Sequence, residues 1–201
     1  MRMFLLLLFT LVFIAPFQQS CTSTGGHHIL VFSYTTGYRH ASIEPGQAAI
    51  KKLGQEHGFE VSISEDPTVF TDESLSQYAA IVFLSTTGDI LNSQQEAAFM
   101  RYIQAGGGYV GVHAAADTEY SWPWYGKLAG AYFHSHPKQA NAAIKITCDG
   151  SAACKDLPSV WSRWDEWYNY RDVQPDLQVI ASLDETSYEG GNMQGNHPIA
   201  W

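Results

Sequence analysis

The sequence predicts an α/β fold in which helices cover both faces of a mostly parallel sheet, giving three layers. Segments of strand length alternate with segments that have helical periodicity. Most of the strand segments are apolar along nearly their whole length, as expected for strands buried on both faces. The chain has 201 residues, of which 45% are hydrophobic, and this is enough material for the core of one domain.

The first elements follow one another in the order that such a fold requires. Residues 28–34 form the first expected strand, and a polar loop comes after it. A helix is expected up to about His57, because Pro45 fits the first turn of a helix and Gly58 fits its end. Residues 59–64 alternate between apolar and polar side chains, which indicates a second strand.

Two more strands and one more helix complete the regular pattern. Residues 79–84 are apolar throughout, and residues 109–112 form the fourth expected strand. Between them, Asn92 caps a helix that ends at the glycines of residues 106–108. After Asp117 the alternation gives way to segments rich in Trp, Tyr and His. Ligand sites collect at the carboxyl ends of parallel strands, so the polar residues there are the first site candidates.

The composition excludes two classes of protein. Twenty acidic side chains against eleven basic ones give a formal net charge of −9, and the chain has no basic run that could follow a nucleic-acid backbone. We therefore expect no nucleic-acid partner. Aromatic residues make up 13% of the chain, which argues for a packed core and against intrinsic disorder.

The N-terminus is predicted to be a secretory signal over residues 1–20, with a short positive start and an apolar run. Cys21 follows this run and resembles the lipidated cysteine of a bacterial lipobox, although Gln18 stands where that pattern has an apolar residue. We expect an exported protein of the bacterial cell envelope, with a lipid on Cys21 as its membrane anchor and residues 21–27 as a tether. The alternative is ordinary cleavage that leaves a free cysteine.

Export makes a disulfide between Cys148 and Cys154 plausible in an oxidising compartment. Closing so small a ring stabilises the fold by roughly 2 kcal/mol, so the bond would stiffen a surface turn. The alternative is a redox-active pair, but the spacing is not that of a C-x-x-C motif. We expect a structural disulfide.

His113 is the leading candidate for catalysis. It stands directly after an expected strand, between the small residues Gly111 and Ala115, which is the arrangement of a nucleophile elbow. The exposed residue of this elbow is His, so it would serve as a general acid/base or a metal ligand and not as an acyl-forming nucleophile. The alternative is a histidine that only bonds a neighbouring carbonyl group.

A second histidine motif raises the question of a metal. His134 and His136 lie two residues apart, so their imidazoles share one side of an extended segment. With His113, Asp117 and Glu166 they could form a zinc-type site, since imidazole and carboxylate are suitable ligands. No metal or other cofactor is assigned. A divalent metal on His113, His134 and His136 is the minor alternative to a polar sugar-binding cluster.

Aromatic and acidic residues alternate in residues 161–170, which contain Trp161, Trp164 and Trp167. Aromatic faces stack on the C–H surface of a sugar ring while carboxylates accept hydrogen bonds from its hydroxyl groups. This pattern indicates a carbohydrate ligand. The alternative is that several of these rings belong to the core.

These stretches together resemble the ThuA-like (trehalose-utilisation) family. The motifs that carry the resemblance are TTGYRHASI (35–43), GVHAAADT (111–118), WPWY (122–125), GAYF and HP (130–133, 136–137), DEWY (165–168) and NHPIAW (196–201). The resemblance covers residues 28–201, and it implies a flavodoxin-like fold of the class I glutamine amidotransferase type. It also implies a role in sugar catabolism, on trehalose-like disaccharides or their 3-keto forms.

The resemblance also nominates site residues. It carries over site positions, namely Arg39, His40, His113, Asp117, His136 and Glu166, but no mechanism. We expect the catalytic residues to be His113 and Asp117. Substrate-binding residues are expected at Arg39, His40, His136, Glu166, Tyr38 and Trp124.

Two departures from the family pattern matter. His113 stands where the amidotransferases have a cysteine, so amidotransferase activity is not expected. The sequence stops at Trp201, where family members continue, so we expect a domain that is incomplete at its C-terminus with an exposed sheet edge.

Two functions from different classes follow. In the first, the protein is an enzyme in which His113 is the acid/base, Asp117 orients it, and Arg39 and His40 hold sugar oxygens. A 3-keto group would acidify the neighbouring C–H bond and permit elimination of the glycosidic bond. In the second, it is a lipid-anchored carbohydrate-binding protein without catalysis. A domain that joins a larger cell-surface complex is a weaker third reading.

Overall fold

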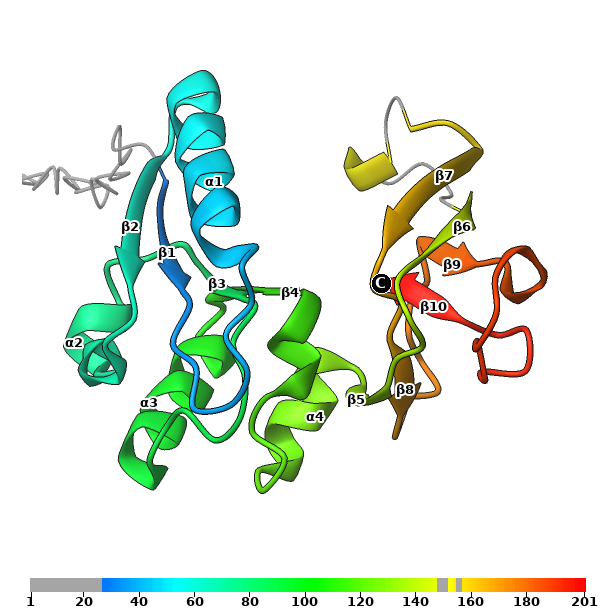
Figure 1. Cartoon of the computed structure of the whole chain (residues 1–201). Helices are drawn as coiled ribbons and strands as arrows, with labels where there is room; N and C mark the ends of the chain where they lie inside the picture. The colour runs from blue at the N-terminus through cyan, green and yellow to red at the C-terminus, as the bar shows by residue number, and fades with distance from the viewer. Residues whose placement is uncertain (1–26, 148–151, 155–156) are drawn as a thin grey trace, which may run out of the picture.

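The computed structural model describes residues 27–147, 152–154 and 157–201 (Figure 1). Its first half is built on a parallel sheet with the strand order β2-β1-β3-β4. The strands are β1 (His28–Phe32), β2 (Glu60–Ser64), β3 (Ala80–Leu84) and β4 (Gly108–Val112). All neighbouring strands pair in parallel, so the four predicted strands and their parallel arrangement are confirmed.

Helices pack on both faces of this sheet, which confirms the layered α/β fold. They are α1 (Ile43–His57), α2 (Asp72–Leu75), α3 (Ser93–Gln104) and α4 (Pro123–Ala129). Side chains alternate along each strand, so Phe32 faces the cluster that contains Phe99 of α3 and Tyr125 of α4. Val31 faces the opposite cluster, where Ile50 of α1 packs against it. The sequence predicted α1 and α3, and not the two shorter helices.

Capping residues explain where α3 begins and where α1 ends. Asn92 accepts hydrogen bonds from the backbone N–H groups of Gln94 and Gln95, and the Gln95 side chain accepts one from the Asn92 N–H group. Gly58 ends α1 with φ of 75°, in the left-handed region that glycine adopts without strain.

The second half of the chain forms two further sheets that the sequence did not predict. An antiparallel sheet has the strand order β10-β9-β6-β7, and a two-stranded ribbon pairs β5 with β8. Their bounds are β5 (Tyr132–Ser135), β6 (Ala140–Ile146), β7 (Val160–Asp165), β8 (Asn169–Arg171), β9 (Ala181–Leu183) and β10 (Pro198–Ala200). In Figure 1 the antiparallel sheet lies beside the parallel half, with its own small apolar core around Ile144, Trp167 and Leu183.

Short 3-10 helices occupy several of the connections. They are η1 (Pro67–Val69), η2 (His113–Asp117), η3 (Ala152–Cys154) and η4 (Glu185–Ser187). η2 matters most for the site, because it follows β4 directly and begins at His113.

Several sequence predictions concern residues outside the described part of the chain. The signal peptide, the lipidation of Cys21 and nearly all of the tether lie there, and so does Cys148. The pairing of Cys148 with Cys154 therefore stays a prediction. Within residues 27–147, 152–154 and 157–201, no helix has the length and apolar character needed to cross a membrane.

Candidate functional site

His113 occupies the strained turn that the sequence predicted. Its φ is 53°, a left-handed backbone conformation that is uncommon for a residue with a side chain. The neighbouring Gly111 makes this turn possible, because a Cβ atom there would lie 2.7 Å from Oη of Tyr109 and 3.2 Å from Cβ of Ala115. The turn directs His113 out of the end of β4, although a 3-10 helix and not an α-helix follows it.

His40 reaches the same region from the loop after β1. This loop is bonded to the loop after β3, since the Thr36 N–H group donates to the Thr87 carbonyl over 2.9 Å. Gly88 permits the close approach, because a Cβ atom there would lie 2.2 Å from Oγ1 of Thr36. The His40 and His113 rings meet edge to face, with their centroids 4.7 Å apart.

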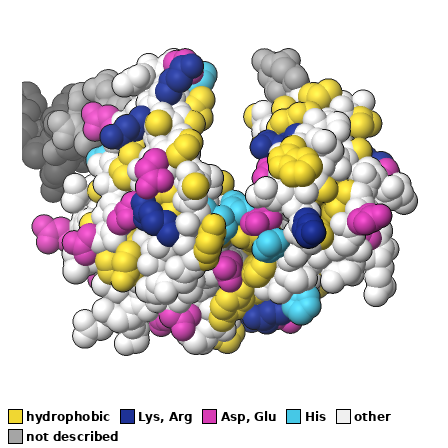
Figure 2. Space-filling model, in the orientation of Figure 1, with side chains coloured by type: hydrophobic (Ala, Val, Ile, Leu, Met, Phe, Trp, Pro, Cys, Tyr) yellow, Lys and Arg dark blue, Asp and Glu magenta, His cyan; other side chains and the backbone are white. Residues whose placement is uncertain are grey.

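Glu166 joins these histidines from the other half of the molecule, on the turn between β7 and β8. Its Oε2 lies 3.4 Å from Nε2 of His113 and 3.8 Å from Nε2 of His40, while its Oε1 lies 3.6 Å from Nε2 of His136. Three imidazoles therefore surround one carboxylate. Figure 2 shows histidine and acidic side chains together at the base of the hollow between the two halves.

Partial burial keeps two of these imidazoles in their neutral, basic form. Burial lowers the pKa of His113 below its usual value, and the nearby His40 lowers it further, while the charge of Glu166 opposes both effects. Burial likewise lowers the pKa of His40, against the charges of Glu166 and Asp117. Both rings can therefore accept a proton at neutral pH, and Glu166 would stabilise the imidazolium that results.

The tautomer of His136 follows from its backbone contact. Its Nδ1 lies 2.8 Å from the carbonyl oxygen of Pro137, which can only accept, so Nδ1 carries a hydrogen. In the neutral ring, Nε2 is then the unprotonated nitrogen that faces Glu166.

Tyr168 forms one wall of the cluster, and the sequence analysis did not single it out as a site residue. Its ring is 4.5 Å from the His113 ring and 4.3 Å from the Phe133 ring, measured between centroids. Its hydroxyl group lies 3.3 Å from Nε2 of His40. Tyr168 is 5% exposed, so it excludes water from one side of the histidines. The DEWY motif contains it, but its role depends on the strand pairing of the second half.

The strand β5, which carries His134, is irregular in its pairing with β8. The strand register shifts between Phe133 and Ser135, so the side-chain alternation is interrupted at His134. His136 and Phe133 both lie against Tyr168, and His134 and His136 are both exposed. The prediction that His134 and His136 share one side stays a prediction.

Two of the remaining predicted residues are Tyr38 and Asp117. Tyr38 contacts His40 edge to face at 4.8 Å and is 72% exposed, so it flanks the cluster. Asp117 accepts a hydrogen bond of 2.5 Å from the Tyr120 hydroxyl group, and the carboxylate in contact with His113 is that of Glu166.

Arg39 and Trp124 have other partners in the described part of the chain. The Arg39 guanidinium donates to Glu65 over 2.8 Å and to Glu44 over 2.7 Å, so its charge is already neutralised. Trp124 stacks on Trp122 and packs against the core.

A cleft of about 390 Å³ opens beside His113. Its lining comes from β4, η2, α4, β8 and the C-terminal residues. It includes Tyr109, Leu128, Tyr170, Ile199 and Trp201. A ligand that contacts His113 would therefore find further space next to it, mostly against apolar and aromatic side chains.

Part of the cluster also has the composition of a metal site. Ligand atoms of His40, His113 and Glu166 all lie within 4.8 Å of one another. Two imidazoles and one carboxylate are the ligands of many catalytic zinc sites. His113 and Glu166 belong to the zinc-type set considered from the sequence, whereas His40 does not.

Comparisons with known proteins agree with the fold. The family model for ThuA, described as trehalose utilisation, matches residues 28–201. A ThuA-like protein from Bacteroides uniformis is 24% identical, with a TM-score of 0.71 over 89% of this chain and 76% of that one. A ThuA-like protein from Parabacteroides merdae is 18% identical, with a TM-score of 0.69 over 87% of this chain and 74% of that one. No curated protein matches the chain.

Proposed function

The chain belongs to the ThuA family of trehalose utilisation, and from this premise we propose that it is an enzyme acting on trehalose-like disaccharides or their 3-keto derivatives. One observation carries the proposal. His40, His113 and His136 surround the Glu166 carboxylate at the carboxyl edge of the parallel sheet. Such a cluster supplies both an acceptor and a donor of protons, which glycoside elimination or hydrolysis requires.

The cluster suits an elimination on a 3-keto sugar. The ketone acidifies the C–H bond at C2, and Nε2 of His113 takes that proton. The electron pair of the C–H bond becomes the C1–C2 double bond while the bond from C1 to the glycosidic oxygen breaks. The imidazolium of His113 then gives this proton to the departing oxygen, so His113 returns to its neutral form. Glu166 stabilises the positive charge that develops on His113.

The test is product release from trehalose and 3-keto-trehalose, followed by chromatography. His113→Ala should lower turnover by roughly 100- to 10,000-fold, because it removes the base. His134→Ala is the matched control, since His134 lies on β5 outside the cluster. The same circular dichroism spectrum in both variants would show that the fold is kept. Turnover that persists in His113→Ala would contradict the assignment.

A second chemistry is favoured by the spacing of His40, His113 and Glu166, whose ligand atoms lie within 4.8 Å of one another. His40, His113 and Glu166 would hold a divalent cation, which would supply Lewis-acid chemistry, and His113 would then serve as a ligand and not as the base. Dialysis against a chelator should then abolish turnover, and added Zn²⁺ or Mn²⁺ should restore it. Unchanged turnover after chelation would leave the metal-free mechanism with His113 as the base.

We also propose that the protein is exported and anchored through a lipid on Cys21, on the strength of the apolar run that precedes this residue. Cys21→Ala should move the protein from the membrane fraction to the soluble fraction. A wild-type chain that is itself soluble would contradict this proposal.

A further inference from the structure

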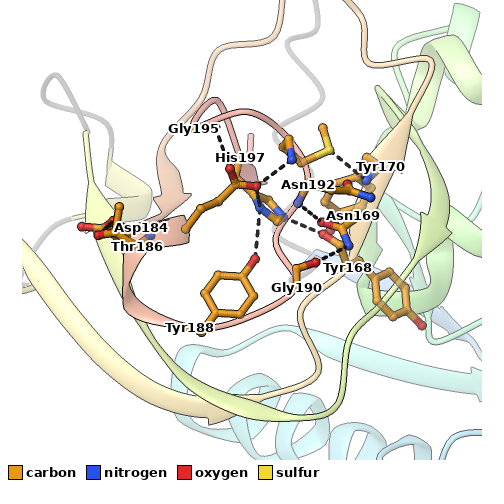
Figure 3. A network of polar contacts seen from close by, with 12 residues as sticks. Tyr168, Asn169, Tyr170, Asp184, Thr186, Tyr188, Gly190, Asn192, Gly195 and His197 are labelled. Atoms are coloured by element: carbon orange, nitrogen blue, oxygen red, sulfur yellow. Dashed lines mark hydrogen bonds and ion pairs between the residues drawn. The ribbon is translucent and has the colours of Figure 1, made fainter.

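The loop between Glu185 and His197 lies against β8, directly behind the wall of the site (Figure 3). Both the nitrogen and the oxygen of the Asn169 side-chain amide are hydrogen-bonded to this loop. Its amide group donates to the Gly190 carbonyl over 3.1 Å, and its Oδ1 accepts from the Asn192 N–H group over 3.0 Å. The loop is thus joined to the strand that follows Tyr168.

His197 connects this loop to Tyr168 itself. It is fully buried, and its Nε2 lies 2.7 Å from the carbonyl oxygen of Tyr168. A carbonyl oxygen only accepts, so Nε2 carries a hydrogen and donates it. On the other side of the ring, Nδ1 lies 3.0 Å from Oε1 of Glu185 and 3.2 Å from the hydroxyl oxygen of Tyr188. Both ring nitrogens therefore have partners, and these contacts fix the orientation of the imidazole.

Glu185 holds His197 in turn. Its two oxygens accept hydrogen bonds from the N–H groups of Met193 and Gly195, each over 2.6 Å. Burial alone would raise the pKa of Glu185, but these backbone bonds and the contact with His197 outweigh it, so the pKa is lowered. The carboxylate is therefore charged, and it closes the loop around the buried histidine.

We propose that Glu185 and His197 position the site: through the Tyr168 carbonyl group they set the Tyr168 ring and the turn that carries Glu166 against His113. Tyr168 is the link, because its carbonyl accepts from His197 while its ring lies 4.5 Å from His113 and its hydroxyl 3.3 Å from His40. Glu166 lies two residues earlier on the same turn. The role in catalysis rests on the proposed function, whereas the positioning itself does not.

Two substitutions of His197 separate this role from a general loss of packing. The amide nitrogen of Gln occupies about the place of Nε2 and can still donate to Tyr168, whereas that of Asn occupies about the place of Nδ1 and reaches only Glu185. Both variants lose the ring, so both lose packing. His197→Asn alone loses the hydrogen bond to Tyr168.

The main readout is the set of imidazole NMR signals of His40 and His113, which needs no activity. We expect these signals to shift in His197→Asn and to stay near their wild-type positions in His197→Gln. Turnover, if the proposed function holds, should fall on the order of a hundredfold in His197→Asn and be largely kept in His197→Gln. If the signals shift in His197→Asn but the wild type has no turnover, the proposed function is rejected and the positioning role stands.

Other outcomes overturn the positioning. Unshifted His40 and His113 signals in a folded His197→Asn variant would do so, and so would equal shifts in both variants. If His197→Asn does not fold, the nitrogen-15 NMR spectrum of the wild type still tests the positioning, because it shows whether Nε2 of His197 carries a hydrogen. A His197 ring with no hydrogen on Nε2 would remove the link to Tyr168.

Discussion

Glu119 shows how a single buried carboxyl group can control the loops beneath the site. Its side chain is fully buried, and its Oε1 accepts hydrogen bonds of 2.8 Å from the N–H groups of both Ile90 and Leu91. Burial raises the pKa of Glu119 from 4.5 to about 7, in spite of these two bonds. The folded protein therefore prefers the protonated form.

A pH-dependent stability follows from that raised pKa. The protonated Glu119 side chain stabilises the fold, and this contribution is fully present below 4.5, the pKa of the group in the unfolded chain. It is lost as the pH rises through the pKa in the folded protein, about 7. Glu119→Gln removes the titration and keeps an oxygen that accepts both N–H groups. When the pH rises from 5 to 8, the free energy of unfolding of Glu119→Gln should increase by about 2–3 kcal/mol relative to that of the wild type.

Urea unfolding at pH 5 and pH 8 measures this difference. Glu60→Gln is a control, because Glu60 is an exposed acid on β2. An equal stability difference between wild type and Glu119→Gln at both pH values would contradict the buried titration.

At the scale of residues, the sequence identified much of the cluster. His113 was named from its place after an expected strand, whereas His40 and the binding roles of His136 and Glu166 came from the resemblance to the ThuA-like family. Tyr168 was not named as a site residue, since nothing local separates a site tyrosine from a core tyrosine. Its position depends on contacts with His197, twenty-nine residues away.

The elements show why prediction succeeded in one half of the chain and failed in the other. β1, β2, β3 and β4 have five residues each and are bounded by clear helix caps and glycines. In the second half, β8, β9 and β10 have three residues each, too few to display an alternating pattern. β7 is exposed over most of its length, and its apolar residues Val160, Trp161 and Trp164 do not alternate with polar ones, so its sequence shows no strand pattern.

The outer edge of β4 leads to a prediction about self-association of the protein. Gly108 and Val112 bond to the β3 side, so the backbone groups of Tyr109 and Gly111 point to the other edge. Val110 is 48% exposed on this strand. Exposed apolar strand edges pair with other chains, so Val110→Lys should lower self-association several-fold at high protein concentration.

Light scattering against concentration checks the role of the edge. Leu53→Lys is the matched control, because Leu53 is 45% exposed on α1, away from any strand edge. Equal scattering by wild type and Val110→Lys, or an equal decrease in both variants, would show that the β4 edge is not the cause.

At the scale of the whole molecule, the site exists only where the two halves meet. His40 and His113 come from the parallel half, whereas His136, Glu166 and Tyr168 come from the segments around the β5–β8 ribbon. The sequence could name members of the cluster but not the way in which the halves join. Glu166 and Tyr168 each contact histidines of both halves.

The most direct test of the account is turnover of 3-keto-trehalose by the wild type and by Glu166→Gln, measured as product released. The account predicts that the wild type cleaves the sugar and that Glu166→Gln loses this activity while keeping its fold, because an amide cannot stabilise the imidazolium of His113. A wild type that cleaves neither 3-keto-trehalose nor trehalose would contradict it, and so would a Glu166→Gln variant with full activity.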